Sequence, residues 1–422
     1  MPRPSGVLRY LMTAFCARMA DEGMAVAVVM LAAHRTGSAA QGAFVLTAWM
    51  APHVLAAPLT GAVAARARRP RLFYVGALGG FALAISVLAM SIGRVPLPAV
   101  LAVAAAGGCC GPAVSGGLSS LITRLLPAGA ERDRAYSWDA AIYNAAAVAG
   151  PGAAGLVSAT LSPTTAVLML SAAAACAAAL MALLPLRPDT AAVRVSPARL
   201  RQDLAAGVRT VRQEQELRAI TAATCLAFIG IGALTTTSVL LAESLGSAGA
   251  GGLLMTAFAA GALTGTLGIA RLRPAASPQR LALIGLLGTG TGLTAAALAP
   301  SAPTAAASFA VAGACDGLVL TATLRIRADH SPPQWRTQVF TIGAGLKISA
   351  AALGSVLVGL ATTGTAHRYL TGIAVLQAAG ALLYTLIRRN PHPDAPAPRP
   401  GSGAGVPGQN GLPESPSPTA PQ

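Results

Sequence analysis

The sequence predicts an all-α membrane protein in which twelve transmembrane helices form two six-helix lobes, with both termini in the cytoplasm. Three features of the chain carry this prediction: its composition, its apolar runs and an internal repeat. Of the 422 residues, 54% are hydrophobic and only 10% are charged, whereas soluble domains are about a quarter charged. The chain therefore lacks the polar residues that a surface in water needs, and its composition fits a lipid bilayer.

Twelve apolar runs are long enough to cross a bilayer, which takes about 20 residues. They cover residues 8–33, 43–65, 72–93, 97–122, 138–160, 164–186, 218–242, 249–270, 280–299, 304–325, 338–362 and 368–388. The first run follows Arg3 and Arg9, as the core of a signal peptide would. It continues to about Ala33 without a clear cleavage site, so we expect a helix that stays in the protein.

The breaks between the runs carry proline, glycine or charged residues, which end helices or stay in water. In the first half they are HRTGSAAQG, ARARRPR, GRVPLP, LPAGAERDR and LSPTT. In the second half they are SLGSAGAGG, RLRPAASPQR, APSAP, RADHSPPQWR and TTGTAHR. Each run is therefore expected to be one span.

The arginine distribution predicts the orientation, because short cytoplasmic loops collect lysine and arginine. With both termini inside, most arginines outside the runs fall in cytoplasmic segments, including Arg325 and Arg327 after the tenth run. The outer loops hold only Arg35, Arg94 and Arg368. The net charge of +16 would also suit nucleic acid, but the basic residues are scattered singly between apolar runs, so we expect no nucleic-acid partner.

The chain repeats itself when it is shifted by about half its length. The most informative matches pair Cys16 with Cys225, Thr47 with Thr256, and Arg71 with Arg280. Because each copy would contain an even number of spans, both copies have the same orientation. Such a parallel repeat is typical of a two-lobed carrier whose pathway lies between the lobes.

The repeat and the breaks predict four parts of the chain. Residues 1–186 form the N-terminal six-helix lobe, and residues 218–390 form the C-terminal lobe. In the cytoplasmic linker, residues 187–217, apolar residues recur at helical spacing from Pro197 and predict an amphipathic helix on the lower face of the second lobe. The tail, residues 391–422, is rich in Pro, Gly and Ser and is expected to be disordered.

Over residues 7–390 the chain resembles the major facilitator superfamily, and the loop GAVAARARRP at 61–70 carries part of the likeness. Gly61, Arg66 and Arg69 fit that family's signature for the loop after the second span, but Ala65 replaces its aspartate. The resemblance implies a charge-based latch between the lobes, which the loss of the aspartate would weaken.

The segment AGPGAAG at 149–155, in the fifth span, is similar to a Gly-Pro signature of exporters in the same family. Gly150, Pro151 and Gly155 match it, whereas the fourth span has no basic residue before Arg124, where many drug–proton antiporters carry an arginine. The resemblance implies proton-coupled alternating access that exports a small apolar or amphipathic compound, a drug or secondary metabolite, across the plasma membrane. The bias toward Ala, Gly, Pro and Arg suggests a high-GC bacterium.

The stretch RMADEGMA, residues 18–25, places three ionisable groups inside the first apolar run. Arg18 neutralises one carboxylate, so either Asp21 or Glu22 must be protonated or paired with another helix. We expect Asp21 to be the proton carrier and Glu22 to be a reserve. The alternative is an intrahelical ion pair that lets the span insert. The second copy of the repeat lacks this cluster, which favours a working role.

Asp316 and Lys347 form a second pair of charges within the spans. Each lies about nine residues from the cytoplasmic end of its run, so both are roughly 14 Å deep. We expect a buried ion pair between them. It would stabilise the packing of the two helices, anchor the substrate, or act as a switch that opens when Asp316 is protonated.

Further candidates for the substrate pathway are polar or aromatic side chains within the spans. They are Trp49, His53, Tyr143, Asn144 and Thr236. Histidine as a residue type suits proton coupling, which makes His53 a candidate, but a single histidine on an apolar face is more often a hydrogen-bonded packing residue. Asp139, at the inner end of the fifth span, is read first as an interface anchor.

The sequence contains no nucleotide-binding loop, metal-ligand spacing or nucleophile motif, so we expect no enzymatic activity, no cofactor and no metal. The expected partners are a small-molecule substrate, protons and the lipid bilayer, and the expected state is a monomer. Two alternatives remain open. One is a sugar or metabolite carrier, for which import is an open direction, and the other is a transporter-like sensor without flux.

Overall fold

The computed structural model describes residues 4–186, 197–247, 251–272, 276–360 and 365–390, and the part of the chain that it describes is helical, without strands. The predicted disordered tail lies outside the described residues. The helices of the first half are α1 (Pro4–Thr36), α2 (Ala39–Met50), α3 (His53–Arg66), α4 (Pro70–Ser91), α5 (Leu97–Gly108), the π-helical turn η1 (Ala113–Gly117), α6 (Leu118–Ser120), α7 (Ile122–Leu125), α8 (Ala130–Thr160) and α9 (Pro163–Ala182). The others are α10 (Pro197–Gln213), α11 (Gln215–Ser244), α12 (Gly251–Leu272), α13 (Pro278–Ala297), α14 (Ala302–His330), α15 (Arg336–Leu360) and α16 (Ala366–Arg389).

Ten helical segments of the described chain are long and apolar enough to cross a membrane, and the bent pair α2–α3 makes an eleventh. The second predicted run is broken after Ala51, because Pro52 cannot donate a backbone hydrogen bond. The fourth run is interrupted by η1, directly after Pro112. The 33-residue α1 carries three charged residues in its middle, Arg18, Asp21 and Glu22, and is not one of the eleven segments. The count of twelve spans and the orientation remain predictions.

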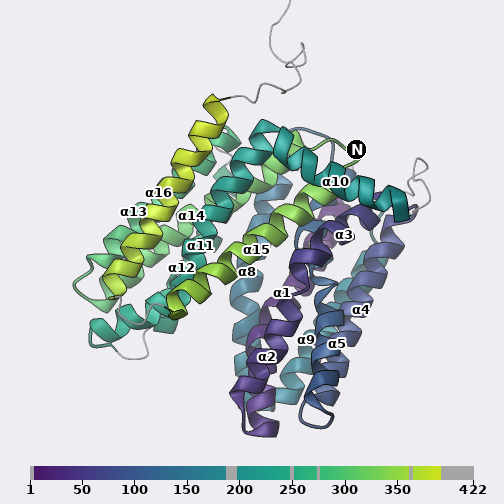
Figure 1. The fold of residues 1–422 in the computed structure, drawn as a ribbon, viewed down its shortest axis with the longest axis horizontal. Helices are drawn as coiled ribbons and strands as arrows, with labels where there is room; N and C mark the ends of the chain where they lie inside the picture. Colours follow the sequence, from purple (N-terminus) through teal and green to yellow (C-terminus); the bar gives the residue numbers. More distant parts are fainter. Residues whose placement is uncertain (1–3, 187–196, 248–250, 273–275, 361–364, 391–422) are drawn as a thin grey trace, which may run out of the picture.

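The helices form two groups, which stand side by side in Figure 1. In the first group α1 packs against α2, α8 and α9, and α4 packs against α5 and α9. In the second group α14 packs against α12 and α13, and α11 packs against α15 and α16. The groups are joined chiefly by contacts of α8 with α12 and α14, of α3 with α15, and of η1 with α15. The site described below lies between these joining helices.

Helix α10 crosses one end of the bundle, where it is drawn in teal near the top of Figure 1. It covers the part of the linker for which the spacing predicts an amphipathic helix, and it packs against α11 and α15 of the second group. It also packs against α3 of the first group. The linker helix therefore contacts both groups rather than the second alone.

The outer surface of the bundle carries large apolar side chains. Leu55, Leu83, Leu156 and Leu253 are each more than 60% exposed. Soluble proteins rarely expose such side chains over large areas, whereas a surface in lipid requires them. The exposed leucines agree with the composition in indicating a membrane protein.

Close backbone contacts between helices depend on glycine. A Cβ on Gly354 of α15 would overlap the carbonyl group of Ile229 on α11, and a Cβ on Gly232 of α11 would overlap that of Ala351. The two helices therefore touch through two reciprocal glycines, as small residues allow in membrane bundles.

Gly354→Ala is expected to lower the free energy of unfolding of the full chain by about 1–3 kcal/mol, because the added methyl group would clash with backbone atoms of α11. The measurement is the thermal midpoint of the purified protein in detergent. Gly372→Ala is the matched control, since a Cβ there meets no atom within 4 Å. Equal midpoints for the two variants would show that α11 and α15 do not depend on this contact.

Candidate functional site

A cavity of about 640 Å³ lies between the two groups of helices. Residues of α1, α2, α3 and α8 line it on one side, and residues of α11, α14 and α15 line it on the other. Much of the wall is apolar, but it also carries ionisable side chains. These are Asp21, Glu22, His53, Tyr143, Asp316, Arg327 and Lys347. The structure thus brings four of the predicted charges, Asp21, Glu22, Asp316 and Lys347, to one cavity, whereas Arg18 does not line it.

The two acids of α1 have no ion-pair partner in the described chain. Asp21 accepts a hydrogen bond from the indole Nε1 of Trp49, at 3.3 Å, and interacts electrostatically with His53. Glu22 has no side-chain hydrogen bond or basic nitrogen within 4.0 Å among the described residues. Both carboxyl groups therefore face the cavity without direct neutralisation.

Arg18 does not serve as the counter-ion predicted for Asp21 and Glu22. Its Nη1 lies 2.7 Å from Oδ1 of Asp139 on α8, and both side chains are at most 2% exposed. Tyr10 and Ser119 each donate a hydroxyl hydrogen bond of 2.7 Å to the same carboxylate. The prediction considered only partners on the same helix. Because α1 packs along α8, the arginine reaches across instead, and Asp139 is a buried acid rather than an interface anchor.

The predicted ion pair between Asp316 and Lys347 is not formed. Both side chains line the cavity, but within the described part of the chain no carboxylate oxygen lies within 4.0 Å of the lysine. The prediction assumed that consecutive spans are close neighbours. Instead α14 packs mainly on α12 and α13, and α15 packs on α11 and α3. The Lys347 Nζ lies 4.4 Å from the ring centre of Phe228, so an aromatic face contacts its charge.

Arg327 is a site residue that was not among the predicted candidates, because it was placed outside the tenth apolar run. It lies on α14, is 4% exposed and lines the cavity. Its Nε and Nη2 have no hydrogen-bond partner in the described chain. The signal that could have found it is spacing: Asp316 and Arg327 are eleven residues apart, which places them on the same face of one helix.

Four of the five predicted pathway residues line the cavity: Trp49, His53, Tyr143 and Asn144. The amide of Asn144 donates a hydrogen bond of 3.2 Å to the carbonyl of Ala262, and so joins α8 to α12. Thr236 is not among the lining residues and its side chain is exposed, because its position on α11 turns it away from the cavity.

The two family-like motifs both lie where helices approach closely. A Cβ on Gly61 of α3 would overlap Thr341 of α15, whereas Arg66 ends α3 and Arg69 directly precedes α4. A Cβ on Gly150 of α8 would lie 2.6 Å from the carbonyl oxygen of Met19 and 3.1 Å from Cβ of Glu22.

The other two residues of the Gly-Pro motif differ from Gly150 in their surroundings. Pro151 lies inside α8, and a Cβ on Gly155 would meet no atom within 4 Å. Within this motif, Gly150 is therefore the residue that holds α8 against the acidic turn of α1.

Two ion pairs that the sequence analysis missed join α8 to α14. The Nη2 of Arg132 lies 2.5 Å from Oδ1 of Asp329, and the Nη2 of Arg325 lies 2.5 Å from Oδ2 of Asp133. Each helix contributes one arginine and one aspartate, so the pairs are reciprocal. In the loop 61–70, where the family resemblance implies a latch aspartate, the chain has Ala65 instead. The α8–α14 pairs therefore hold the groups together near the end where α10 lies.

The double variant Asp133→Asn and Asp329→Asn is expected to weaken this end of the bundle. Partly exposed ion pairs contribute up to about 1 kcal/mol each, so the fraction of molecules open there should rise several-fold. The measurement is the labelling rate of a cysteine at Ser120, near Thr337 of α15, with other cysteines removed. Glu131→Gln is the control, because Glu131 is exposed on the same turn of α8. An unchanged labelling rate would contradict a latch function for these pairs.

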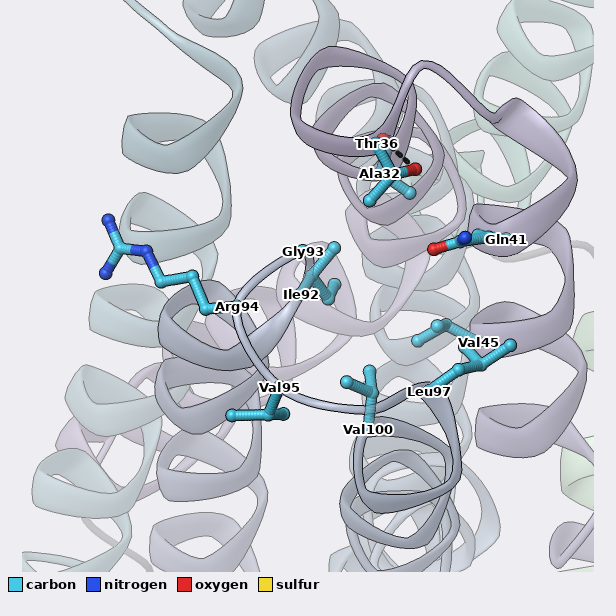
Figure 2. Close-up of a pocket in the computed structure, with 10 residues that line it drawn as sticks. All are labelled: Ala32, Thr36, Gln41, Val45, Ile92, Gly93, Arg94, Val95, Leu97 and Val100. Carbon is cyan, nitrogen blue, oxygen red and sulfur yellow. Dashed lines mark hydrogen bonds between the residues drawn. The ribbon is translucent and has the colours of Figure 1, made fainter.

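A second pocket of about 350 Å³ lies within the first group of helices, between the end of α1, α2, and the connection from α4 to α5. Figure 2 shows Val45, Val95 and Val100 among the side chains that line it, and shows that the guanidinium of Arg94 points away from the other lining residues. This pocket has no lining residue from the second group. It therefore does not have the position of a site between lobes.

A bundle of apolar helices around a charged central cavity defines a class of protein, the membrane transporters, because ionisable groups at that depth mark a substrate or ion path. A family model described as Major Facilitator Superfamily matches residues 10–240 and 220–419. The chain belongs to the major facilitator superfamily. It is also 25% identical over 400 residues to an uncharacterized MFS-type transporter, y4rN, of Sinorhizobium fredii, which covers 92% of this chain and 96% of the relative.

Solved structures show the same fold at low sequence identity. The human organic anion transporter MFSD10 superposes with a TM-score of 0.76 and 17% identity, over 91% of this chain and all of that chain. The Escherichia coli fucose:proton symporter FucP gives a TM-score of 0.70 and 12% identity, over 92% and 99% of the two chains. The likeness is one of fold, and the compounds named for these two transporters belong to those proteins.

Proposed function

We propose that this transporter exports a small apolar or amphipathic compound, a drug or secondary metabolite, across a bacterial plasma membrane in exchange for protons. One observation carries the proposal: Asp21, Glu22 and Asp316 face one cavity, and none has a basic nitrogen within 4.0 Å in the described chain. Ionised carboxylates without a counter-ion are unfavourable at such depth. Taking up a proton removes that penalty, so each acid is suited to load and release protons.

Asp21 is the preferred proton carrier. Of the three acids, it has a polar neighbour that orients it, the indole of Trp49 on α2. His53 lies next along the same bent span, at the first residue of α3, and also faces the cavity. A proton that arrives through the cavity therefore meets His53, Trp49 and Asp21 in one region. Glu22 and Asp316 are the alternative carriers.

The remaining wall suits an apolar or amphipathic substrate. Leu46, Met50, Phe228, Leu320 and Phe340 supply large apolar side chains. The cavity volume of about 640 Å³ is also within the usual range of about 300–1,000 Å³ for small-molecule sites. An apolar substrate binds to such a wall by expelling water, whereas ionised acids in the cavity retain water. Binding of the substrate and ionisation of the acids therefore disfavour each other.

Alternating access follows from how the two groups of helices meet. At one end they are joined by the reciprocal α8–α14 ion pairs and by the contact of Gly61 with Thr341. These contacts consist of partly exposed charges and close backbone approaches, which a rocking motion can separate and re-form. The cavity between the groups would then open to one side at a time.

The test uses everted membrane vesicles that contain the chain and have an acidified lumen. A panel of fluorescent amphipaths, which includes 1-anilino-8-naphthalenesulfonate, is added outside, and both dye uptake and proton efflux are recorded. Export coupled to protons predicts uptake that releases lumenal protons and stops with an uncoupler. Uptake that survives the uncoupler would reject proton coupling. Uptake confined to right-side-out vesicles would favour an importer, and binding without flux would favour a sensor.

A further inference from the structure

We infer that the cavity binds a substrate with an anionic group, a carboxylate, sulfonate or phosphate, which Arg327 and Lys347 hold beside the aromatic ring of Phe228. This inference rests on the proposed function, because it defines the substrate class of the same cavity. It is carried by the positions of these side chains.

Arg327 is buried with unused hydrogen-bond donors. Its side chain is 4% exposed, and its Nε and Nη2 have no partner in the described chain. Buried polar groups are nearly always paired, and an unpaired one needs an explanation. A planar guanidinium with two adjacent free donors matches the two oxygens of a carboxylate or sulfonate.

The acids of the cavity are not placed to satisfy Arg327. No carboxylate oxygen lies within 4.0 Å of its guanidinium among the described residues. Asp316 lies three helical turns away on the same helix, a rise of about 16 Å. An arginine side chain does not reach across that distance, so the partner has to come from elsewhere.

Helix α15 is shaped to leave room for this guanidinium. A Cβ on Gly343 would overlap the guanidinium of Arg327, so only glycine allows the side chain its observed position. Lys347 follows Gly343 by four residues and therefore lies on the same face of α15, one turn further into the cavity. The two cationic groups thus share one wall.

The neighbourhood of Lys347 defines the rest of the ligand. Its Nζ lies 4.4 Å from the ring centre of Phe228 and 5.9 Å from that of Tyr143. Within the part of the chain that the structure describes, Lys347 has no carboxylate oxygen within 4.0 Å. An anionic head placed between Arg327 and Lys347 would therefore have aromatic surface beside it, which suits an aromatic or otherwise apolar body.

The experiment compares two dyes that share one skeleton. 1-Anilino-8-naphthalenesulfonate carries a sulfonate, and N-phenyl-1-naphthylamine is the same molecule without it. Binding is measured on the purified full chain in detergent by energy transfer from Trp49, which lines the cavity. Trp138 and Trp335, the other two tryptophans, are changed to Phe so that the signal reports the cavity alone.

The expected result is saturable binding of the sulfonate that weakens about tenfold or more in Arg327→Gln and in Lys347→Gln, since hydrogen bonds to charged groups are lost. Binding of the neutral dye should change by less than about twofold. Arg280→Gln, at an exposed position of α13, makes the same charge change outside the cavity and should leave both dyes unaffected. Gly343→Ala should also weaken the sulfonate without changing any charge.

Three outcomes would overturn the inference: equal binding of the two dyes by the parent protein, equal loss of both dyes in the Gln variants, or no energy transfer with either dye. A variant that does not elute as a folded species is replaced by Arg327→Lys, which keeps the charge and should retain part of the sulfonate preference. The proposed function fails separately. Proton-driven uptake of a neutral compound with no anion preference would reject this inference alone, and anion preference without proton coupling would reject the proposed function alone.

Discussion

Replacing Asp21 with Asn is expected to abolish proton-driven accumulation of the substrate. If one proton is exchanged per substrate, a pH difference of about 2 units supplies about 2.7 kcal/mol, which supports an accumulation ratio of about 100. Asparagine has nearly the same size and can still accept the hydrogen bond from Trp49, but it cannot release a proton. The ratio should therefore fall to about one, while exchange of labelled for unlabelled substrate continues.

The measurement is the ratio of lumenal to external substrate in everted vesicles at a fixed pH difference. Glu131→Gln, an exposed acid outside the cavity, is the matched control and should keep the full ratio. A normal ratio in Asp21→Asn with a collapsed one in Glu22→Gln or Asp316→Asn would transfer the role to that acid. A normal ratio in all three variants would reject proton coupling through these carboxyl groups.

The sequence predicted the helices of this protein better than their contacts. Apolar runs, proline and charge locate helices because each of these signals acts within a few residues. Where a run was broken, the cause was also local: Pro52 separates α2 from α3, and a proline in the middle of an apolar run is visible in the sequence. The family likeness was also confirmed, because its motifs consist of short stretches.

The partners of the charged residues could not be predicted in the same way. Arg18 was matched with acids three and four residues away, whereas its partner Asp139 is 121 residues away in the chain. Arg327 was placed in a loop because its distance from the end of an apolar run was judged without knowing where α14 ends. Such pairings depend on which helices pack together, and one sequence contains no record of that. The predicted cavity residues on α1, α2, α3 and α8 were nevertheless found in one wall, because polar residues inside apolar spans have few other places to lie.

The second large effect is expected from Asp139, which is the acceptor at the centre of the buried network. Its carboxylate receives Arg18, Tyr10 and Ser119, and it is 0% exposed. Asp139→Ala would leave the arginine charge buried without a counter-ion, so we expect a loss of about 3–5 kcal/mol in the free energy of unfolding. The measurement is denaturant or thermal unfolding of the full chain in detergent.

The opposite single variant should be less harmful, and this asymmetry makes the prediction specific. In Arg18→Met the carboxylate keeps two hydroxyl donors, Tyr10 and Ser119. In Asp139→Ala the guanidinium keeps neutral side-chain contacts alone, the Ser119 hydroxyl at 2.9 Å and the ring of Tyr143 at 3.8 Å, among the described residues. The double variant Arg18→Met with Asp139→Leu removes both charges and should recover most of the stability, because a buried ion pair contributes little relative to apolar side chains of similar volume. If the double variant also retained proton-driven transport, Arg18 and Asp139 would be a structural brace, and the cavity acids alone would carry coupling. If it folded but lost coupling, the network would have to open during the transport cycle.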